Sequence, residues 1–384
     1  MLAVLTRPRC RRALFPTLFK KFTVLAFESS ADDTCAAVVT SDRQILSNVV
    51  IKQHHLNEKW GGIHPAAAVM EHQANMPVAA KRALAEANLD MSGIDGIAFT
   101  RGPGMGICLS VACNAAKTLA AVTGKPLVGV HHMQAHALTP LLTSWPDIPT
   151  FPFLSLLISG GHTLLLLANS VDSFRILATT RDESIGRTFD KVTRELGLGW
   201  AGPSLEKFCN QDIESKTPRD FTPFSNAMPG EMGFSYSGYH SQVERFVHRR
   251  GGVENIAPEE KVAVARAFQE AVVDHLESKL MLGIKQCFRE NIPIKHVIIS
   301  GGVASNSYLR ARLTRMLSNP PVNGGLTLQY PPPSLCTDNA VMVAWASMHR
   351  FLAGDHDGFS LNPVTKWSIE MLSTKESNQQ ATPI

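Results

Sequence analysis

Short apolar runs alternate along the chain with longer segments of helical spacing. The short runs are ended by polar turns, a pattern typical of buried β-strands. We predict strands at residues 22–27, 35–39, 45–51, 97–100, 126–130, 153–158, 164–167, 174–178 and 295–300. Apolar residues three and four positions apart predict helices at 71–88, 107–122, 186–196, 259–290, from Asn306 onward and at 338–351.

The same order of elements occurs twice. A strand, a tight polar turn, two further strands and then a helix occur around E-S-S-A-D-D-T and again around S-G-G-H-T, and a Pro-rich aromatic segment at 145–153 separates the two. This predicts an α/β fold of two duplicated lobes, whose turns face one cleft. Lobe I is expected at 22–145 plus about 340–370, lobe II at 146–339, and a flexible tail at 371–384.

Length and composition agree with two lobes. A chain of 384 residues exceeds what one hydrophobic core usually serves. Its 44% hydrophobic and 18% charged residues are typical of a soluble globular enzyme. Because no uninterrupted apolar stretch approaches ~20 residues, we predict no membrane association.

Residues 1–21 differ from the rest. They carry six basic residues and no acidic one, interleaved with Leu, Val and Phe, which is typical of a mitochondrial presequence; a disordered basic tail is the alternative. Without them 31 Lys and Arg face 33 Asp and Glu, so the net charge falls from +4 to −2. The remaining chain therefore lacks the overall basic charge of a general nucleic-acid binder.

The seven cysteines are scattered and form no C-x-x-C pair. We expect them to be reduced and mostly buried, without a disulfide framework or a zinc knuckle.

A candidate metal site begins in V-G-V-H-H-M-Q-A-H. His132 and His136 are four residues apart, so on a helix their rings lie on one face and can hold a single ion. Asp338, just before the last predicted helix, is the candidate third ligand. His131 faces about 100° away on a helix and is the weaker candidate. Met133 follows His132 where a zincin protease has its general-base Glu, so we expect a metal here to polarise or hold a substrate instead.

Three glycine turns end predicted strands: R-G-P-G-M-G, I-S-G-G-H-T and I-S-G-G-V-A. Glycine lets the backbone approach a ligand, and free amides at such turns suit anionic oxygens, so we expect a nucleotide or phosphate site. There is no Walker or Rossmann motif. Asp190 and Glu206 are candidates for binding hydroxyl groups, or else surface charges paired with Lys191 and Lys207. Two arginine groups are candidates for a phosphate-contacting rim or for solvated helix faces: Arg245, Arg249, Arg250 and Arg310, Arg312, Arg315.

Together these motifs resemble the tRNA N6-adenosine threonylcarbamoyltransferases, and specifically their mitochondrial members. The resembling stretches occur in the family's order over residues 22 to about 345. They are F-E-S-S-A-D-D-T (27–34), G-G-I-H-P-A (61–66), T-R-G-P-G-M (100–105), V-H-H-M-Q-A-H (130–136), L-I-S-G-G-H-T (157–163), F-D-K (189–191), F-S-Y-S-G (234–238), G-G-V-A-S-N (301–306) and C-T-D-N-A (336–340).

The resemblance implies an actin/Hsp70/sugar-kinase type fold, with two duplicated lobes around a central cleft. It implies transfer of the threonylcarbamoyl group from threonylcarbamoyl-AMP to N6 of adenosine 37 in mitochondrial tRNAs reading ANN codons, with release of AMP in the mitochondrial matrix. His132, His136 and Asp338 would bind one divalent cation, iron or zinc. The donor would be held by Leu157, Ile158, Ser159, Gly160, Gly161, Asp190, Gly202, Glu206 and Asn306. The partners implied are tRNA and threonylcarbamoyl-AMP, and a homodimer is one candidate assembly.

The chain departs from the family's pattern at three positions. Ala31 stands in place of the usual Cys of the first turn, so no thiol is needed there. Ala66 replaces a common Glu, and His240 replaces the usual Lys after F-S-Y-S-G, which puts a phosphate contact there in doubt.

Other functions would use some of the same residues. A small-molecule carbamoyltransferase or kinase of the same fold would not require tRNA. A metalloprotease would cleave a protein, and a non-enzymatic nucleotide-binding partner would tolerate loss of His132 or Asp338.

Overall fold

The computed structural model describes residues 21–318 and 325–373. The predicted presequence lies outside the described residues except for Lys21, as do residues 374–384 of the predicted tail. Residues 371–373, predicted to belong to that tail, are instead part of a 3-10 helix, η4 (Ile369–Ser373), because Ile369 packs into the core and η4 contacts a strand of the second sheet.

The first half of the chain forms a five-stranded mixed sheet. Its spatial order is β3-β2-β1-β4-β5, with β1 antiparallel to β2 and parallel to β4. The strands are β1 (Thr23–Glu28), β2 (Thr34–Thr40), β3 (Ile45–Ile51), β4 (Gly96–Gly102) and β5 (Leu127–His131).

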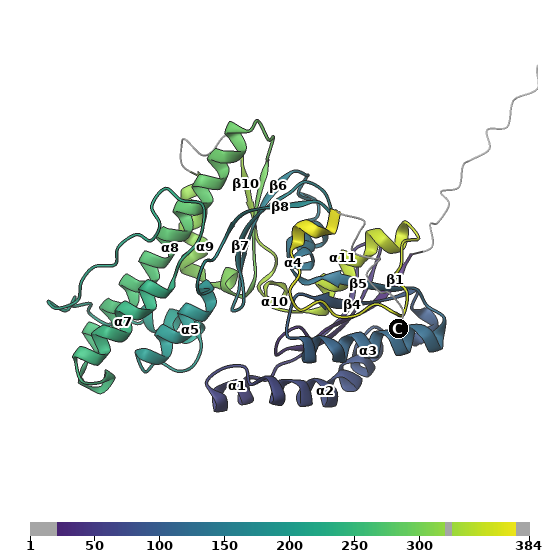
Figure 1. The fold of residues 1–384 in the computed structure, drawn as a ribbon, viewed down its shortest axis with the longest axis horizontal. Helices are drawn as coiled ribbons and strands as arrows, with labels where there is room; N and C mark the ends of the chain where they lie inside the picture. The colour runs from purple at the N-terminus through teal and green to yellow at the C-terminus, as the bar shows by residue number, and fades with distance from the viewer. Residues whose placement is uncertain (1–20, 319–324, 374–384) are drawn as a thin grey trace, which may run out of the picture.

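The second half repeats this topology in a second sheet. Its order is β10-β9-β6-β7-β8, with β6 antiparallel to β7 and parallel to β9, so each strand matches its counterpart in the first sheet. The strands are β6 (Phe153–Ile158), β7 (Thr163–Ala168), β8 (Phe174–Thr179), β9 (His296–Ser300) and β10 (Thr327–Gln329). The predicted α/β duplication is confirmed, and Figure 1 shows the two halves side by side.

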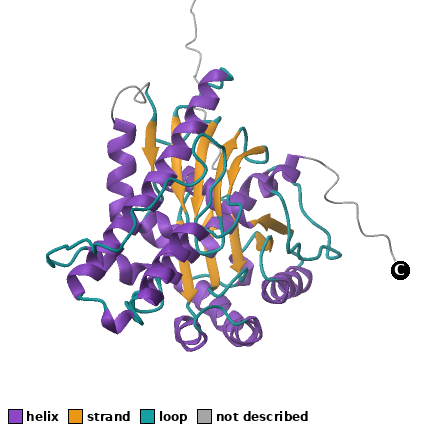
Figure 2. Cartoon of the chain, turned by 60° about the vertical axis from the view of Figure 1, so that its left-hand side comes forward, coloured by secondary structure: helices purple, strands orange, loops and turns teal. Residues whose placement is uncertain are grey.

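Helices cover both faces of each sheet, which is why β1 and β6 are buried along their whole length (Figure 2). In β1, Leu25 and Phe27 join the core under α2 and α3, whereas Val24 and Ala26 face α11. The helices of the first half and the final helix are α1 (His54–Trp60), α2 (Pro65–Glu86), η1 (Met91–Gly93), α3 (Gly106–Thr123), α4 (His132–Thr143) and α11 (Ala340–Leu352).

The outer face of the second sheet packs on α8, and Leu276 and Leu280 share a core with Leu154 and Leu156. Its inner face shares a core with α4 and α11, so these two helices connect the sheets. The remaining helices are α5 (Ile185–Glu195), α6 (Gly202–Cys209), α7 (Ser237–Arg249), η2 (Val253–Asn255), α8 (Pro258–Arg289), η3 (Gly302–Ser305), α9 (Ser307–Ser318) and α10 (Pro333–Cys336).

The predicted strands and long helices agree with these elements, with two kinds of difference. Helix α2 begins at Pro65 rather than near residue 71, because His64 accepts a bond from the Ala67 amide and proline is favoured at the first helical position. The short elements α1, α6, α7, α10 and β10 were not predicted.

Helix α3 is long and apolar enough to cross a membrane by length and composition alone. It packs against β4 and α2, and Ala112 and Ala116 are fully buried in that core. Such a helix is weak evidence for a membrane span. The six cysteines among the described residues are buried and unbridged, as predicted.

Candidate functional site

Helix α4 positions both histidines of the candidate metal site. His131 ends β5 and caps α4, its Nδ1 accepting a bond from the Met133 amide at 3.2 Å. His132 and His136 follow on one face of the helix, as predicted, with ring centroids 4.8 Å apart and both side chains buried. His131 points elsewhere, since its Nε2 donates to the Trp367 carbonyl.

Asp338 reaches this pair from the far end of the chain. It lies between α10 and α11, next to Asn339, which caps α11 by accepting a bond from the Met342 amide. Its Oδ1 lies 3.1 Å from Nε2 of His136 and 3.5 Å from Nε2 of His132. One ligand atom from each residue lies within 4.8 Å of the others, so the structure brings the three predicted ligands together.

The surroundings of the triad fit a cation. Glu28, fully buried at the end of β1, accepts a bond from Nδ1 of His132 at 3.2 Å, which leaves Nε2 directed at Asp338. A carboxylate behind a ligand histidine is a common feature of metal sites. Nε2 of His136 also faces Asp338, so each of the two imidazoles presents one nitrogen to the same carboxylate. One divalent cation therefore fits this set of side chains.

The charges of the triad are strongly coupled. Burial acts to lower the pKa of His132, but the carboxylates of Asp338 and Glu28 outweigh it and raise the pKa to about 9. Burial acts to raise the pKa of Asp338, and the opposing charge of His132 and the bond from His136 hold it well below its usual range. Both shifts follow from opposite charges held close together in a buried centre, where each stabilises the charged form of the other.

The polar turn after β1 adds two further carboxylates. Burial and the charges of Asp32 and Asp338 raise the pKa of Asp33 to about 8, and one oxygen of Asp33 is buried without a partner. Asp32 accepts a bond from Asn57 of α1 at 2.5 Å. Glu28, Asp32 and Asp33 were not assigned a role from the sequence, although carboxylates in a turn that follows a buried strand were a signal for one.

The glycine turn between β6 and β7 leaves space for a ligand. Leu157 and Ile158 belong to β6, and the Ser159 carbonyl accepts a bond from the Gly186 amide of α5 at 3.2 Å. A Cβ atom added to Gly160 or Gly161 would meet nothing within 4 Å. The backbone of this turn can therefore approach a bound group closely.

The other predicted donor-binding residues form two contacts between helices. Oδ1 of Asp190 accepts a bond from the Gly202 amide at 2.7 Å, at the start of α6, and burial raises its pKa. Glu206 accepts bonds from the amide and hydroxyl of Ser307. Asn306 precedes α9, and its Oδ1 accepts a bond from the Leu309 amide. Neither carboxylate is paired with the neighbouring lysine, and Lys191 pairs with Glu183 instead.

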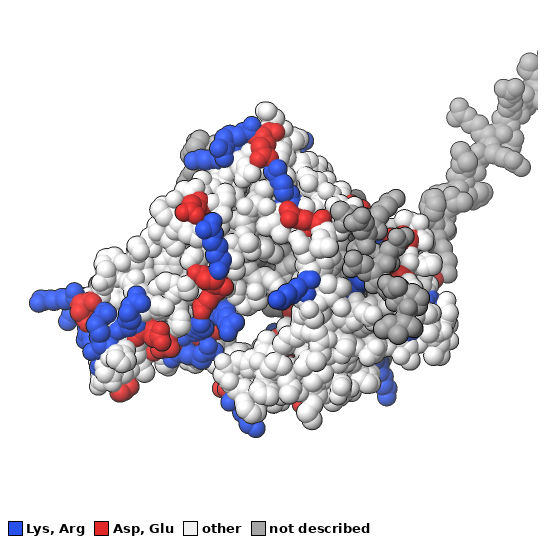
Figure 3. All heavy atoms as spheres, in the orientation of Figure 1, with Lys and Arg blue, Asp and Glu red and all other residues white. Residues whose placement is uncertain are grey.

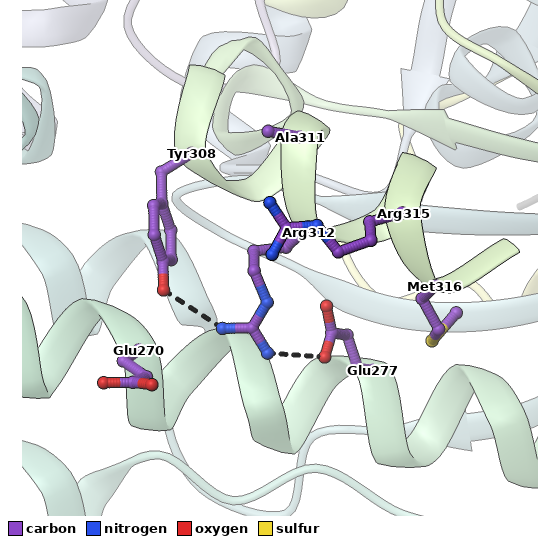
Figure 4. A pocket seen from close by; sticks show the side chains of 7 residues that line it. All are labelled: Glu270, Glu277, Tyr308, Ala311, Arg312, Arg315 and Met316. Carbon is purple, nitrogen blue, oxygen red and sulfur yellow. Dashed lines mark hydrogen bonds and ion pairs between the residues drawn. The ribbon is translucent and has the colours of Figure 1, made fainter. Parts of the chain in front are cut away.

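The larger of the two cavities described here, about 610 Å³, lies away from the triad, between α8 and α9. Figure 4 shows Arg312 extended between Tyr308 and Glu277 along its floor, and the side chain also pairs with Asp274. None of the predicted ligand or donor residues lines it. We assign it a structural role, because Arg312, Tyr308 and Glu277 in its wall already interact with one another.

Three arginines of the predicted rim make contacts within the protein. Arg250 is paired with Asp220 and Glu260, and Arg312 with acids of α8. Arg310 donates to the Ala304 carbonyl and lies over the Tyr330 ring. In Figure 3 blue and red side chains are interleaved on the face in view, and the surface is hollowed where the two halves meet.

Comparison with known proteins gives one consistent family. Residues 44–345 match the family model TsaD, described as tRNA N6-adenosine threonylcarbamoyltransferase. A probable mitochondrial tRNA N6-adenosine threonylcarbamoyltransferase of Arabidopsis thaliana is 37% identical over 353 residues, which cover 89% of this chain and 72% of the relative. The tRNA N6-adenosine threonylcarbamoyltransferase of Cereibacter sphaeroides is 39% identical over 359 residues, which cover 91% of this chain and 94% of the relative.

Among solved structures, the crystal structure of T. kodakarensis HypF matches with a TM-score of 0.51 at 13% sequence identity. The match covers 87% of this chain and 47% of that one. At this identity the likeness supports the fold alone, and it agrees with the predicted actin/Hsp70/sugar-kinase type of duplicated lobes.

Proposed function

Because the chain belongs to the tRNA N6-adenosine threonylcarbamoyltransferase family, we propose that it transfers threonylcarbamoyl from threonylcarbamoyl-AMP to adenosine 37 of mitochondrial tRNAs reading ANN codons. The family's activity makes the protein a transferase acting on tRNA. In the proposed reaction N6 attacks the carbamoyl carbon and loses a proton, the bond from that carbon to the phosphate oxygen breaks, and AMP leaves with the electron pair.

The observation that carries the proposal is the meeting of His132 and His136 with Asp338 across 202 residues of sequence. A divalent cation bound there would act as a Lewis acid on a carbonyl or carboxylate oxygen of the donor. Glu28 holds the His132 ring in place, so the ligand atoms are arranged before the substrate arrives. Because the donor is already an activated anhydride, the side chains only need to orient the two reactants and stabilise the leaving phosphate.

The donor is proposed to lie along the second half of the site. The amides of Leu157, Ile158, Ser159, Gly160 and Gly161 would face the phosphate, where the open space beside both glycines supports close approach. The nucleoside would lie towards Asp190, Gly202, Glu206 and Asn306. The free carboxylate oxygens of Asp190 and Glu206 suit ribose hydroxyls. For the triad of His132, His136 and Asp338, iron and zinc are the cations to test first.

The location in the cell is part of the same proposal. The basic, acid-free residues 1–21 and the mitochondrial name of the Arabidopsis relative support import into the matrix. A fusion of residues 1–40 to a fluorescent protein should enter mitochondria, and the same fusion with its six leader cations changed to Gln should not. A homodimer is the proposed assembly, tested by the mass of the purified protein in solution.

One assay tests the function and its site. The purified full chain is given threonylcarbamoyl-AMP and an ANN-decoding tRNA, and the digested tRNA is examined by mass spectrometry for N6-threonylcarbamoyladenosine. The wild type should form it, His136→Ala should form none, and His248→Ala, which changes an exposed histidine of α7, should match the wild type. Absence of product with the wild type contradicts the function, whereas full activity of His136→Ala contradicts the site.

The same assay separates the alternatives. A small-molecule carbamoyltransferase or kinase would consume its donor without tRNA, and a protease would cleave protein. Release of AMP that depends on tRNA excludes both.

A further inference from the structure

A second cavity of about 330 Å³ lies beside the candidate metal centre. His131 and Met133, the neighbours of His132 in the chain, form part of its wall, and His162 of the glycine turn forms another part. The His162 ring lies 6.3 Å from the His132 ring. The cavity therefore lies beside both the triad and the turn proposed to hold the donor. Its volume is at the lower end of small-molecule sites.

A C-terminal strap, residues 362–370, closes this cavity on the outer side. The Val364 amide donates to the Arg101 carbonyl at 2.8 Å, and the Trp367 carbonyl accepts from His131 at 3.1 Å, which ties the strap to the first sheet. Glu370 accepts a bond from the Ile176 amide of β8 at 2.9 Å, which ties it to the second. Figure 1 shows this segment in yellow, returning from α11 towards α4 and β8.

The wall of the cavity suits a flat aromatic ring. Met133, Leu164 and Ile176 give it an apolar lining, and the Trp367 ring lies 4.7 Å from the His131 ring. The guanidinium of Arg101 lies over one face of the Trp367 ring, 5.2 Å from its centroid, and the neighbouring Lys366 is exposed. An apolar, aromatic cavity with cations at its edge is complementary to a nucleobase whose flanking phosphates stay outside.

We propose that this cavity receives the acceptor adenine of the tRNA, swung out of its loop, and that Trp367 is the positioning residue on which the base stacks. The inference rests on the proposed function, and it places the acceptor on the opposite side of the glycine turn from the donor nucleoside. A base within a stacked loop cannot reach a buried centre, so an enzyme acting on it must hold it unstacked. The strap that carries Trp367 is bound to both sheets, so the position of the base would be fixed relative to both halves of the molecule.

The test measures Michaelis constants for tRNA and for threonylcarbamoyl-AMP separately. Trp367→Ala should raise the KM for tRNA about 10- to 100-fold, as expected for loss of one base-stacking contact, and leave the KM for the donor within about twofold. Trp367→Phe should recover most of the tRNA affinity. Trp145→Ala, which removes an exposed tryptophan outside the cavity, should behave as the wild type.

Each outcome decides the inference. An unchanged tRNA KM in Trp367→Ala overturns it, and a change confined to the donor KM overturns it by assigning the cavity to the threonyl part of the donor. If Trp367→Ala fails to fold, Ile176→Phe, which fills the cavity and keeps the strap, must raise the tRNA KM by a similar factor. If the wild type forms no product, the proposed function is wrong, and the assignment of the cavity to the acceptor adenine is wrong with it.

Discussion

Oε2 of Glu28 lies 3.2 Å from Nδ1 of His132, and this contact decides which nitrogen of the imidazole faces the cleft. Because Nδ1 donates to the carboxylate, Nε2 is the nitrogen that faces Asp338 and would bind a cation there. Glu28 also accepts bonds from the Ser30 amide, in the turn after β1, and from the Thr100 hydroxyl of β4. These two bonds fix the position of its carboxylate.

Glu28→Gln should weaken metal binding about 10- to 100-fold, because it removes the charge behind His132 while keeping the shape of the side chain. Affinity is measured by competition with a chromophoric chelator, which needs no turnover. Glu86→Gln, the same substitution at an exposed position of α2, is the control. Equal affinity of both variants would show that Glu28 has only a packing role.

Substitutions of glycine should separate ligand binding from folding. Gly160→Ala should leave the melting temperature within about 2 °C of the wild type and lower the affinity for AMP, because its methyl group meets no protein atom and enters the proposed phosphate space. Gly301→Ala should destabilise the fold, since Gly301 has φ +99° and an added Cβ would lie 2.3 Å from the Ile158 carbonyl oxygen.

Both variants are compared by thermal unfolding and by AMP titration. The assignment of the turn to the donor is wrong if Gly160→Ala binds AMP as tightly as the wild type. Normal stability of Gly301→Ala would mean that β6 and β9 separate easily at this point.

The fold was predictable where burial dictates the pattern. β1 and β6 have both faces covered, so they appear as continuous apolar runs. Helix α7 was missed because the aromatic residues it buries belong to a segment with many polar positions, and β10 because three residues give no periodicity. Helix α1 carries a single buried residue, Asn57, so no apolar stripe marks it.

The site was predictable only in part. The i, i+4 spacing of His132 and His136 is local, and a helix turns it directly into geometry. Asp338 was named as a candidate from its place before the last predicted helix, but local spacing could not show its pairing with His136, because pairing across 202 residues depends on how α11 packs against α4. Glu28 looks like an ordinary strand-end residue, and nothing local shows that β1 ends beneath His132.

Arg312→Ala should lower the free energy of unfolding by about 1 to 2 kcal/mol, because the guanidinium joins Tyr308 of α9 to Asp274 and Glu277 of α8 and leaves Glu277 unpaired when removed. Urea denaturation measures the change. Arg315→Ala, on the same helix and lining the same cavity, should cost less than about half as much. Equal effects would mean that the network contributes through general charge rather than through these contacts.

Acid should destabilise the protein through His275 of α8. This fully buried imidazole accepts a bond from the Ser235 amide at 3.2 Å, and burial together with the charge of Lys279 lowers its pKa to about 4. In the unfolded chain the pKa returns to about 6.5. Between these values the unfolded state binds a proton that the native state excludes, so stability is complete above about pH 6.5 and is lost as the pH falls towards 4.

His275→Gln should remove this source of pH dependence, because glutamine does not titrate. Its carbonyl oxygen can still accept the bond from the Ser235 amide. The fall in unfolding free energy between pH 7 and pH 4 should then be smaller by about 3 kcal/mol than in the wild type. His248→Gln, at an exposed position, should follow the wild-type curve, which separates His275 from the carboxylates that titrate in the same range. Parallel pH profiles for the wild type and His275→Gln, measured by urea denaturation at each pH, would exclude His275 as a source of the acid sensitivity.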